Sequence, residues 1–326
     1  MTATATASPP RARWNRWSRS KASTSERLEA PPTSSFEQSS SVPPLSPGKQ
    51  LARAALIIVF IMAFTLVLQL VLIGSFQQTS AQERKFDSFR SDLANGTAPI
   101  GPTDSETREL AIGTPVAYIE IPEIGLRQVV VEGTTPSALF SGPGHRRDTP
   151  LPGQIGASVI MGRHAAFGGP FSKIDQLEAD DLITVTTGQG VFEYVVIGVR
   201  REGDPIPSPA EPGTGRLLLA TADGRPFLPD GVLRIDAELS EGAVVGAPRI
   251  YTPNTLPAAE RLMGADTSTL WALALWIQGL ILLSVGAVWA WHRWGHAQAW
   301  IVFLPPLLLV GLATSGEVAR LLPNLL

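Results

Sequence analysis

The sequence predicts an all-β domain, either a barrel or a sandwich, carried between membrane-spanning helices. Within residues 113–250, short runs of β-branched and apolar residues alternate with clusters of Gly, Pro and Asp, a pattern typical of successive strands and turns. No helical pattern in this region exceeds two turns, which argues against a parallel α/β sheet. The predicted strands are residues 116–121, 128–131, 157–161, 182–187, 191–199, 216–221 and 232–239.

The composition places part of the chain in lipid and excludes several kinds of site. Charged residues make up 17% of the 326 residues, whereas an average soluble domain has about 25%. The absence of cysteine excludes disulfides, thiolate metal sites and a thiol nucleophile. A net charge of −3 argues against a nucleic-acid partner. We predict no cofactor and no metal, because Glu178, Asp180 and Asp181 fit a solvated turn better than a calcium site.

The chain before the β-rich region is predicted to form a tail, an anchor and a linker. Residues 1–53 are rich in Ser, Pro and basic residues and bury too little apolar surface to order, so we predict a disordered cytoplasmic tail. Residues 54–76 form a predicted transmembrane helix, because 54–74 are uncharged and long enough to cross about 30 Å of hydrocarbon. Residues 77–112 are predicted to be an extracellular linker with a short polar helix near 83–93.

Two further apolar segments follow the β-rich region. A predicted linker at 251–269 leads to a transmembrane helix at 270–291, where Trp residues near both ends suit the two membrane interfaces. Residues 298–315 are apolar but contain Pro305 and Pro306. This third segment is therefore either a kinked span, which would complete a C-terminal helical hairpin, or a re-entrant segment that does not cross the membrane fully.

The distribution of charge predicts the orientation in the membrane. Residues 1–53 hold eight Lys or Arg and three acidic residues, which favours the cytoplasmic side. Residues 77–269 hold 16 basic and 25 acidic residues. We therefore expect a protein of the cell membrane whose β domain faces the extracellular side.

Five segments of the β-rich region carry a resemblance to a known family. They are IPEIGLRQVVVEGTTPSALFSGPGH, TPLPGQIGASVIMGRH, GGPFSKIDQLEADDLITV, LLLATADG and GVLRIDAEL. In this order and spacing they resemble the sortases, the membrane-anchored cysteine transpeptidases of Gram-positive cell surfaces. The resemblance implies that residues 113–250 form a sortase-like β-barrel ectodomain, between the N-terminal transmembrane helix and the C-terminal hairpin.

The resemblance also implies three catalytic groups, which this sequence carries only in part. In the family a cysteine thiolate attacks a threonine carbonyl of a sorting signal, a histidine transfers protons, and an arginine stabilises the oxyanion or positions the substrate. The arginine corresponds to Arg234. The cysteine corresponds to Ala222, which has no nucleophile. The family's Gly-His-Arg corresponds to Gly162-Arg163-His164, so the imidazole is displaced by one residue.

Other roles for the residues near these positions stay open. Thr221 is the nearest hydroxyl to the nucleophile position, but neighbouring strand residues point to opposite faces. His145 fits a structural role in the turn that follows it, and His164 fits an exposed loop. We therefore assign a catalytic role to no residue with assurance. The candidate binding residues are Arg234, Arg163, His164 and His145.

The sequence therefore predicts a non-catalytic sortase homologue that binds an extended peptide or a cell-envelope protein in the former active-site groove. Loss of the thiol leaves Arg234 and the backbone donors for recognition, unless Arg234 only pairs with Asp236 or Asp223. The proline-rich loop 202–215 is either a preordered peptide contact or a stiff connection. Two alternatives are an enzyme, a sortase-type transpeptidase or hydrolase with an altered catalytic set, and a membrane assembly protein acting through its helices.

Overall fold

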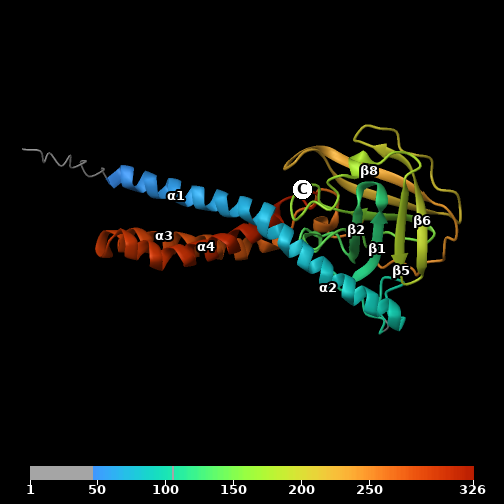
Figure 1. The fold of residues 1–326 in the computed structure, drawn as a ribbon, viewed down its shortest axis with the longest axis horizontal. Helices are drawn as coiled ribbons and strands as arrows, with labels where there is room; N and C mark the ends of the chain where they lie inside the picture. The colour runs from blue at the N-terminus through green and yellow to red at the C-terminus, as the bar shows by residue number, and fades with distance from the viewer. Residues whose placement is uncertain (1–46, 105) are drawn as a thin grey trace, which may run out of the picture. The chain divides into compact units, whose positions relative to one another are not determined.

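The computed structural model describes residues 47–104 and 106–326, and most of the predicted tail at 1–53 lies outside this part of the chain. The described residues form three long helical segments and one β-barrel (Figure 1). The helices are α1 (Pro47–Leu68), α2 (Gly74–Asn95), α3 (Leu270–Trp294) and α4 (His296–Leu321). The strands are β1 (Pro115–Ile121), β2 (Leu126–Glu132), β3 (Gly144–His145), β4 (Gly156–Met161), β5 (Leu182–Thr187), β6 (Gly190–Arg200), β7 (Gly215–Arg225) and β8 (Leu228–Leu239).

The barrel predicted from the family resemblance is confirmed. Its strands close in the order β1-β2-β3-β4-β7-β8-β6-β5. The pairs β2–β3 and β4–β7 are parallel, and the remaining neighbours are antiparallel. All seven predicted strands are present. The two-residue strand β3 was not predicted, because a strand of that length has no alternating pattern to detect.

The core of the barrel consists of the inward-facing residues of successive strands. Ile119, Ile183, Tyr194, Leu219 and Ile235 are all fully buried in one apolar cluster. Because side chains alternate along a strand, the residues between them face outward and are free to build a surface site. On β7 and β8, that outward face carries a second, smaller apolar cluster, which is described below.

The first helical segment is longer than predicted. A π-helical turn, η1 (Gln69–Ile73), joins α1 to α2 without a break, so the helix continues to Asn95. The short helix predicted near 83–93 is therefore the end of one continuous segment, and the prediction of a separate helix was wrong. No proline lies between Gly74 and Asn95, and Gly96 ends the helix in the left-handed conformation with φ 69°.

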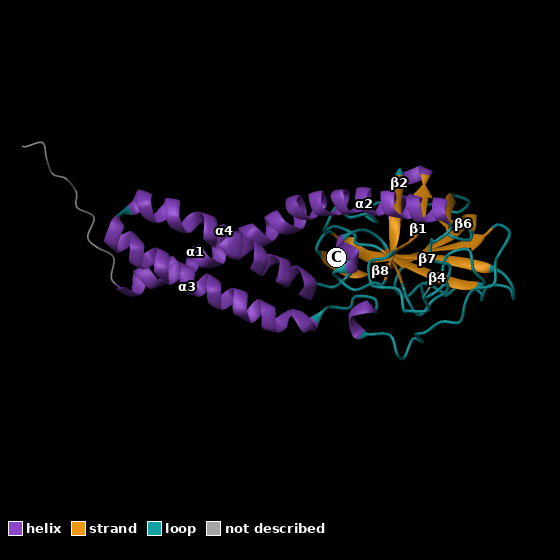
Figure 2. Ribbon diagram, turned by 90° about the horizontal axis from the view of Figure 1, so that it is seen from below, coloured by secondary structure: helices purple, strands orange, loops and turns teal. Residues whose placement is uncertain are grey.

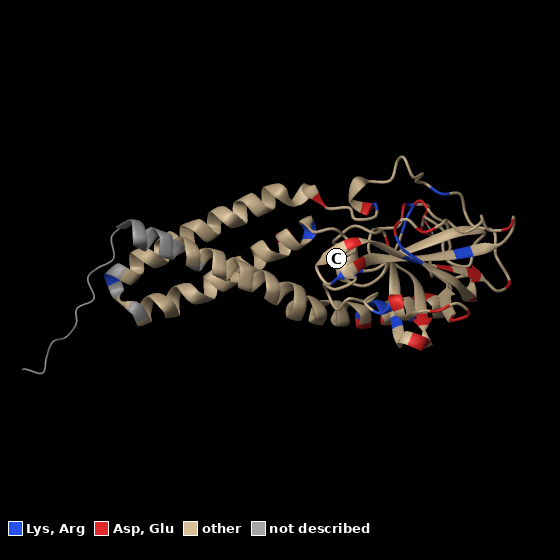
Figure 3. Cartoon of the chain, turned by 90° about the horizontal axis from the view of Figure 1, so that it is seen from above, with Lys and Arg blue, Asp and Glu red and all other residues tan. Residues whose placement is uncertain are grey.

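Among the described residues, three helices are long and apolar enough to cross a membrane: 58–95, 267–291 and 297–321. Figure 2 shows α1, α3 and α4 as long helices that extend from one side of the barrel, and Figure 3 shows that the middle parts of these helices are free of Lys, Arg, Asp and Glu. The third segment continues through Pro305 and Pro306 as one helix. At 1.5 Å per residue, its 25 residues span about 37 Å, which is long enough to cross a hydrocarbon core of about 30 Å.

Polar contacts from both α1 and α2 hold the first helical segment against the rest of the chain. In α1, the Thr65 hydroxyl accepts a hydrogen bond from Ser315 of α4 at 3.1 Å. In α2, the Gln82 side chain bonds the backbone of Val129 on β2 in both directions, at 2.7 and 3.0 Å. Phe89 of α2 is almost completely buried. The part of 77–112 predicted to be a linker is therefore packed against the barrel as far as α2 extends.

Candidate functional site

Ala222 lies near the end of β7, on the face of the strand turned away from the central core. The N–H of Gly162, just after β4, donates to the carbonyl of Ala220 at 3.0 Å. Arg163 therefore follows β4 at the level where Ala222 lies on the parallel strand β7. Thr221 points to the opposite face, is fully buried, and donates its hydroxyl to the carbonyl of Gly162 at 2.8 Å. This hydroxyl is engaged and does not replace the missing thiol.

Arg163 is completely buried. Its guanidinium carbon lies 4.9 Å from the centre of the Phe140 ring and 5.2 Å from that of Phe167. Nη1 donates to the carbonyl of Leu326 at 3.0 Å, and Nη2 donates to the carbonyl of Pro136 at 3.1 Å. Burial lowers the pKa of Arg163 to about 9, so the group stays protonated at neutral pH. It acts as a hydrogen-bond donor to peptide carbonyls and not as a base.

The region around Ala222 is filled by residues 322–326, which follow α4 and are called the α4 extension below. Leu325 and Leu326 are 0% and 6% exposed. The N–H of His164 donates to the carbonyl of Leu325 at 2.8 Å, so His164 is held at this site and is only partly exposed. The predicted groove is occupied in this structure. The two leucines share an apolar cluster with Leu139, Val159, Met161, Ala220, Ala222 and Val232.

Arg234 lies on β8, on the same face of the sheet as Ala222. It pairs with Ala220 across β7 and with Arg200 across β6, and paired residues share a face. Burial, and next the charge of Arg200, lower the pKa of Arg234. Arg234 forms no ion pair within the described part of the chain. Both acids expected as partners are engaged elsewhere, since Asp236 pairs with Arg200 at 3.0 Å and Asp223 with Arg201 at 3.3 Å.

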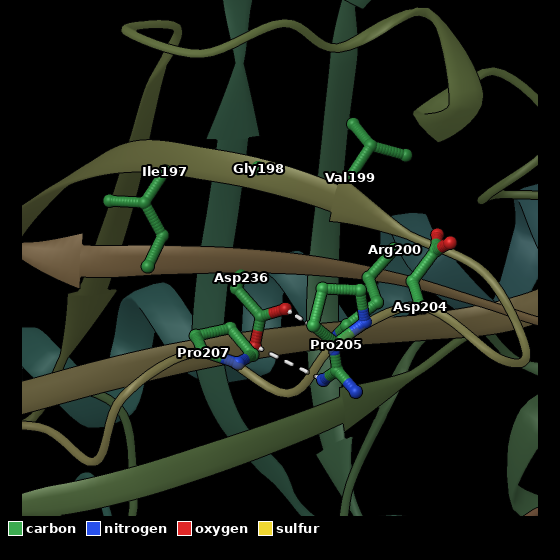
Figure 4. A pocket seen from close by; sticks show the side chains of 8 residues that line it. All are labelled: Ile197, Gly198, Val199, Arg200, Asp204, Pro205, Pro207 and Asp236. Carbon is green, nitrogen blue, oxygen red and sulfur yellow. Dashed lines mark hydrogen bonds and ion pairs between the residues drawn. The ribbon is translucent and has the colours of Figure 1, made fainter.

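A pocket of about 240 Å³ opens beside Arg200, between β6, β8 and the proline-rich loop (Figure 4). Figure 4 shows the Arg200–Asp236 ion pair at its centre, with two prolines of the loop beside it. Since Arg200 pairs with Arg234 across the strands, the loop covers the sheet next to Arg234. The pocket is lined by Ile197, Gly198, Val199, Arg200, Asp204, Pro205, Pro207 and Asp236.

His145 lies apart from these residues, inside the turn that follows β3. Its Nδ1 is 2.9 Å from Glu132 Oε2, and its Nε2 is 2.9 Å from the carbonyl oxygen of Pro150. Burial is the strongest single influence and lowers the pKa of His145. The charge and hydrogen bond of Glu132, together with Pro150 and Asp148, outweigh it and raise the pKa above its ordinary value. Both ring nitrogens are engaged, so a ligand has no free nitrogen to contact.

The raised pKa of His145 predicts a loss of stability at alkaline pH. Folding favours the protonated ring, so this contribution is complete below the unfolded pKa of about 6.5 and disappears as pH rises through the folded-state pKa. We expect Glu132→Gln, which removes the charge but keeps the size, to flatten the dependence of the melting temperature on pH above 6.5. Thermal melts of the purified chain from pH 5.5 to 9.5 test this, and identical profiles for both proteins would contradict it.

Several groups at the site were not predicted. One is the aromatic pair of Phe140 and Phe167, whose stacked rings have their centres 3.9 Å apart. Another is the α4 extension, including the fully buried Asn324. The Pro and Asn after an apolar helix predict where that helix stops, but nothing in their local pattern indicates a return to the barrel. Among the described residues, no group of three His, Asp or Glu is placed to hold a metal ion.

Comparison with known proteins identifies the family of the barrel. Residues 119–221 match the family model of the sortase domain. The matched region ends one residue before Ala222, and Arg234 lies outside it. Sortase D of Bacillus subtilis (strain 168) is 26% identical over 124 residues, which are 37% of this chain and 60% of that protein. The match thus spans less than two thirds of the length of this relative.

Solved structures of sortases are similar to part of this chain. A sortase E from Streptomyces avermitilis is 28% identical, with a TM-score of 0.35, over 40% of this chain and 91% of the other. A sortase D transpeptidase from Clostridium perfringens is 22% identical, with a TM-score of 0.42, over 50% of this chain and 99% of the other. The family model and the Bacillus relative support a sortase domain in the barrel, at residues 119–221.

Proposed function

We propose that this chain is a non-catalytic, membrane-anchored sortase homologue, whose former active site binds an extended peptide or a cell-envelope protein without cleaving it. The observation that carries the proposal is the role of Arg163. At the position corresponding to the family's histidine, a protonated guanidinium donates to two main-chain oxygens, the carbonyl of Pro136 and the oxygen of Leu326. This arrangement recognises a peptide backbone and has no means of accepting a proton from a nucleophile.

The surroundings of Ala222 support the same proposal. A sortase-type reaction needs a thiolate and a base within about 3 Å of each other. This chain has no cysteine, and the methyl group of Ala222 packs in an apolar cluster. The remaining features suit recognition: Arg234 has no carboxylate partner within the described residues, and the N–H of His164 already donates to a carbonyl. Binding and bond cleavage use separable groups, so loss of one does not remove the other.

A restoration series tests whether catalysis was lost at these positions. We expect Ala222→Cys alone to give no efficient cleavage of sorting-signal peptides, because a thiol without a base stays mostly protonated near its pKa of about 8.5. Adding Arg163→His supplies an imidazole at the corresponding position, and we expect higher turnover from the double variant than from Ala222→Cys. Peptide turnover by the single variant, the double variant and the unaltered chain as control is measured by mass spectrometry. Equal rates for the single and double variants would contradict this assignment of position 163.

For localisation, we propose that the barrel faces the outside of the cell membrane and the tail faces the cytoplasm. The cysteine-free chain allows a direct test with single introduced thiols. On intact cells, a membrane-impermeant maleimide is expected to label Ile206→Cys in the exposed loop, but to label Ser40→Cys in the tail only after permeabilisation. Labelling of Ser40→Cys in intact cells would reverse the orientation.

A further inference from the structure

The α4 extension, residues 322–326, lies in the site as a bound peptide would. Two of its carbonyls accept hydrogen bonds from the barrel: that of Leu325 from the His164 N–H at 2.8 Å, and that of Leu326 from Arg163 Nη1 at 3.0 Å. Its two leucine side chains fill the apolar cluster around Ala222. The segment turns at residues 323–326, where the N–H of Leu326 donates to the carbonyl of Pro323 at 3.2 Å. Main-chain contacts fix its position, and its leucine side chains pack in the apolar cluster.

Asn324 fixes the extension from its other side. This residue is fully buried, and its Nδ2 donates to the carbonyls of Thr134 at 2.8 Å and of Arg261 at 2.9 Å. Its backbone N–H donates to the carbonyl of Gly264 at 2.8 Å. The extension is therefore held between the barrel and residues 258–264, and its direction and register are specified by at least three polar contacts.

We propose that the α4 extension is the resident ligand of the former active site and closes it to peptides supplied from outside. This inference rests on the proposed peptide-binding function and adds the identity of the occupant. Because α4 ends at Leu321, only the extension itself separates the helix from the site. A ligand tethered this closely acts at an effective concentration in the millimolar range, so a free peptide of similar sequence competes poorly with it.

The accessibility of position 222 tests the proposal in the full chain, purified in detergent. Ala222→Cys introduces the single thiol of the chain at a position that is 2% exposed, and its rate of reaction with a maleimide is measured. The opened background carries Leu325→Ser and Leu326→Ser. The matched control makes the same change at two exposed leucines, Leu182→Ser and Leu228→Ser.

We expect Ala222→Cys to react at least tenfold faster in the opened background than in the unaltered or control background. A thiol at the exposed Ile206 is expected to react at one rate in all three, which shows that the substitutions do not alter thiol reactivity in general. Circular dichroism of the three proteins checks that they are folded. Asn324→Ala, which keeps both leucines and removes the anchoring amide, is expected to give an intermediate rate. Equal rates at position 222 in all backgrounds would overturn the proposal.

A fluorescent peptide copying residues 320–326 separates this inference from the proposed function. We expect it to bind the opened chain and not the unaltered chain. Equal binding to both would show that the extension does not close the site, and would overturn the inference while supporting peptide recognition. Faster labelling at position 222 without any peptide binding would support closure by the extension and overturn the proposed binding function.

Discussion

Replacement of Arg163 by alanine is expected to destabilise the chain by about 3–5 kcal/mol, the cost of removing a large buried side chain. Arg163 is among the largest fully buried side chains of the described residues. Its loss leaves a cavity beside the stacked rings of Phe140 and Phe167, and leaves the main-chain oxygens of Pro136 and Leu326 without their donor. Chemical denaturation of the purified chain measures the effect.

Arg163→Met is the matched control for this prediction. Methionine fills most of the same volume without a buried charge, so we expect it to recover more than half of the stability lost by Arg163→Ala. Arg163→Met is still expected to be less stable than the unaltered chain, because the two main-chain oxygens lose their donor. Each buried group left without a partner costs about 1–3 kcal/mol. A loss under about 1 kcal/mol for Arg163→Ala, where buried truncations of this size cost several times more, would contradict the burial of this guanidinium.

The second large effect is expected at Arg147, which holds residues 251–260 against the barrel. Its Nε donates to Glu260 Oε2 at 2.9 Å, and its Nη2 pairs with Glu260 Oε1. Glu260 is 0% exposed. Burial lowers the pKa of Arg147, but the hydrogen bonds and charge of Glu260 outweigh it and raise the pKa. The guanidinium also lies 4.3 Å from the centre of the Tyr251 ring.

Arg147→Ala leaves the Glu260 carboxylate buried and unpaired, so we expect a loss of about 3–5 kcal/mol. The double variant Arg147→Met and Glu260→Gln removes both charges, and we expect it to be more stable than the single variant. Denaturation of the three proteins measures the difference. If the double variant were as unstable as Arg147→Ala, the unpaired carboxylate would not be the cause of the loss.

The strands and spans of this protein could be predicted because each depends on a local pattern. Alternating apolar residues mark β5 and β6, and uninterrupted apolar runs mark the three membrane-length helices. The continuity of α2 was missed because its polar face carries little periodicity, and its packing depends on Gln82 and Phe89 contacting a distant strand. Helix propensity alone does not reveal such tertiary support.

The sequence could point to candidate positions for a site but not to the residues that surround them. The positions of Ala222, Arg163 and Arg234 follow from the order of the strands, and the pairing of β4 with β7 and of β7 with β8 places them on one face. The burial of Arg163 and the presence of Leu325 and Leu326 depend on contacts across about 160 residues of chain. No local pattern encodes a contact of that range, so the occupied state of the groove required the structure.

The most direct test of a binding site without catalysis is the activity of the unaltered chain. The full protein in detergent is mixed with a sorting-signal peptide and an amine acceptor, and the masses of both peptide and protein are followed over time. We predict no cleaved or transferred peptide and no covalent adduct on the protein, because no thiolate or available base stands at positions 222 and 163. Peptide cleavage that is abolished by Arg234→Ala would contradict this result and identify an enzyme with an altered catalytic set.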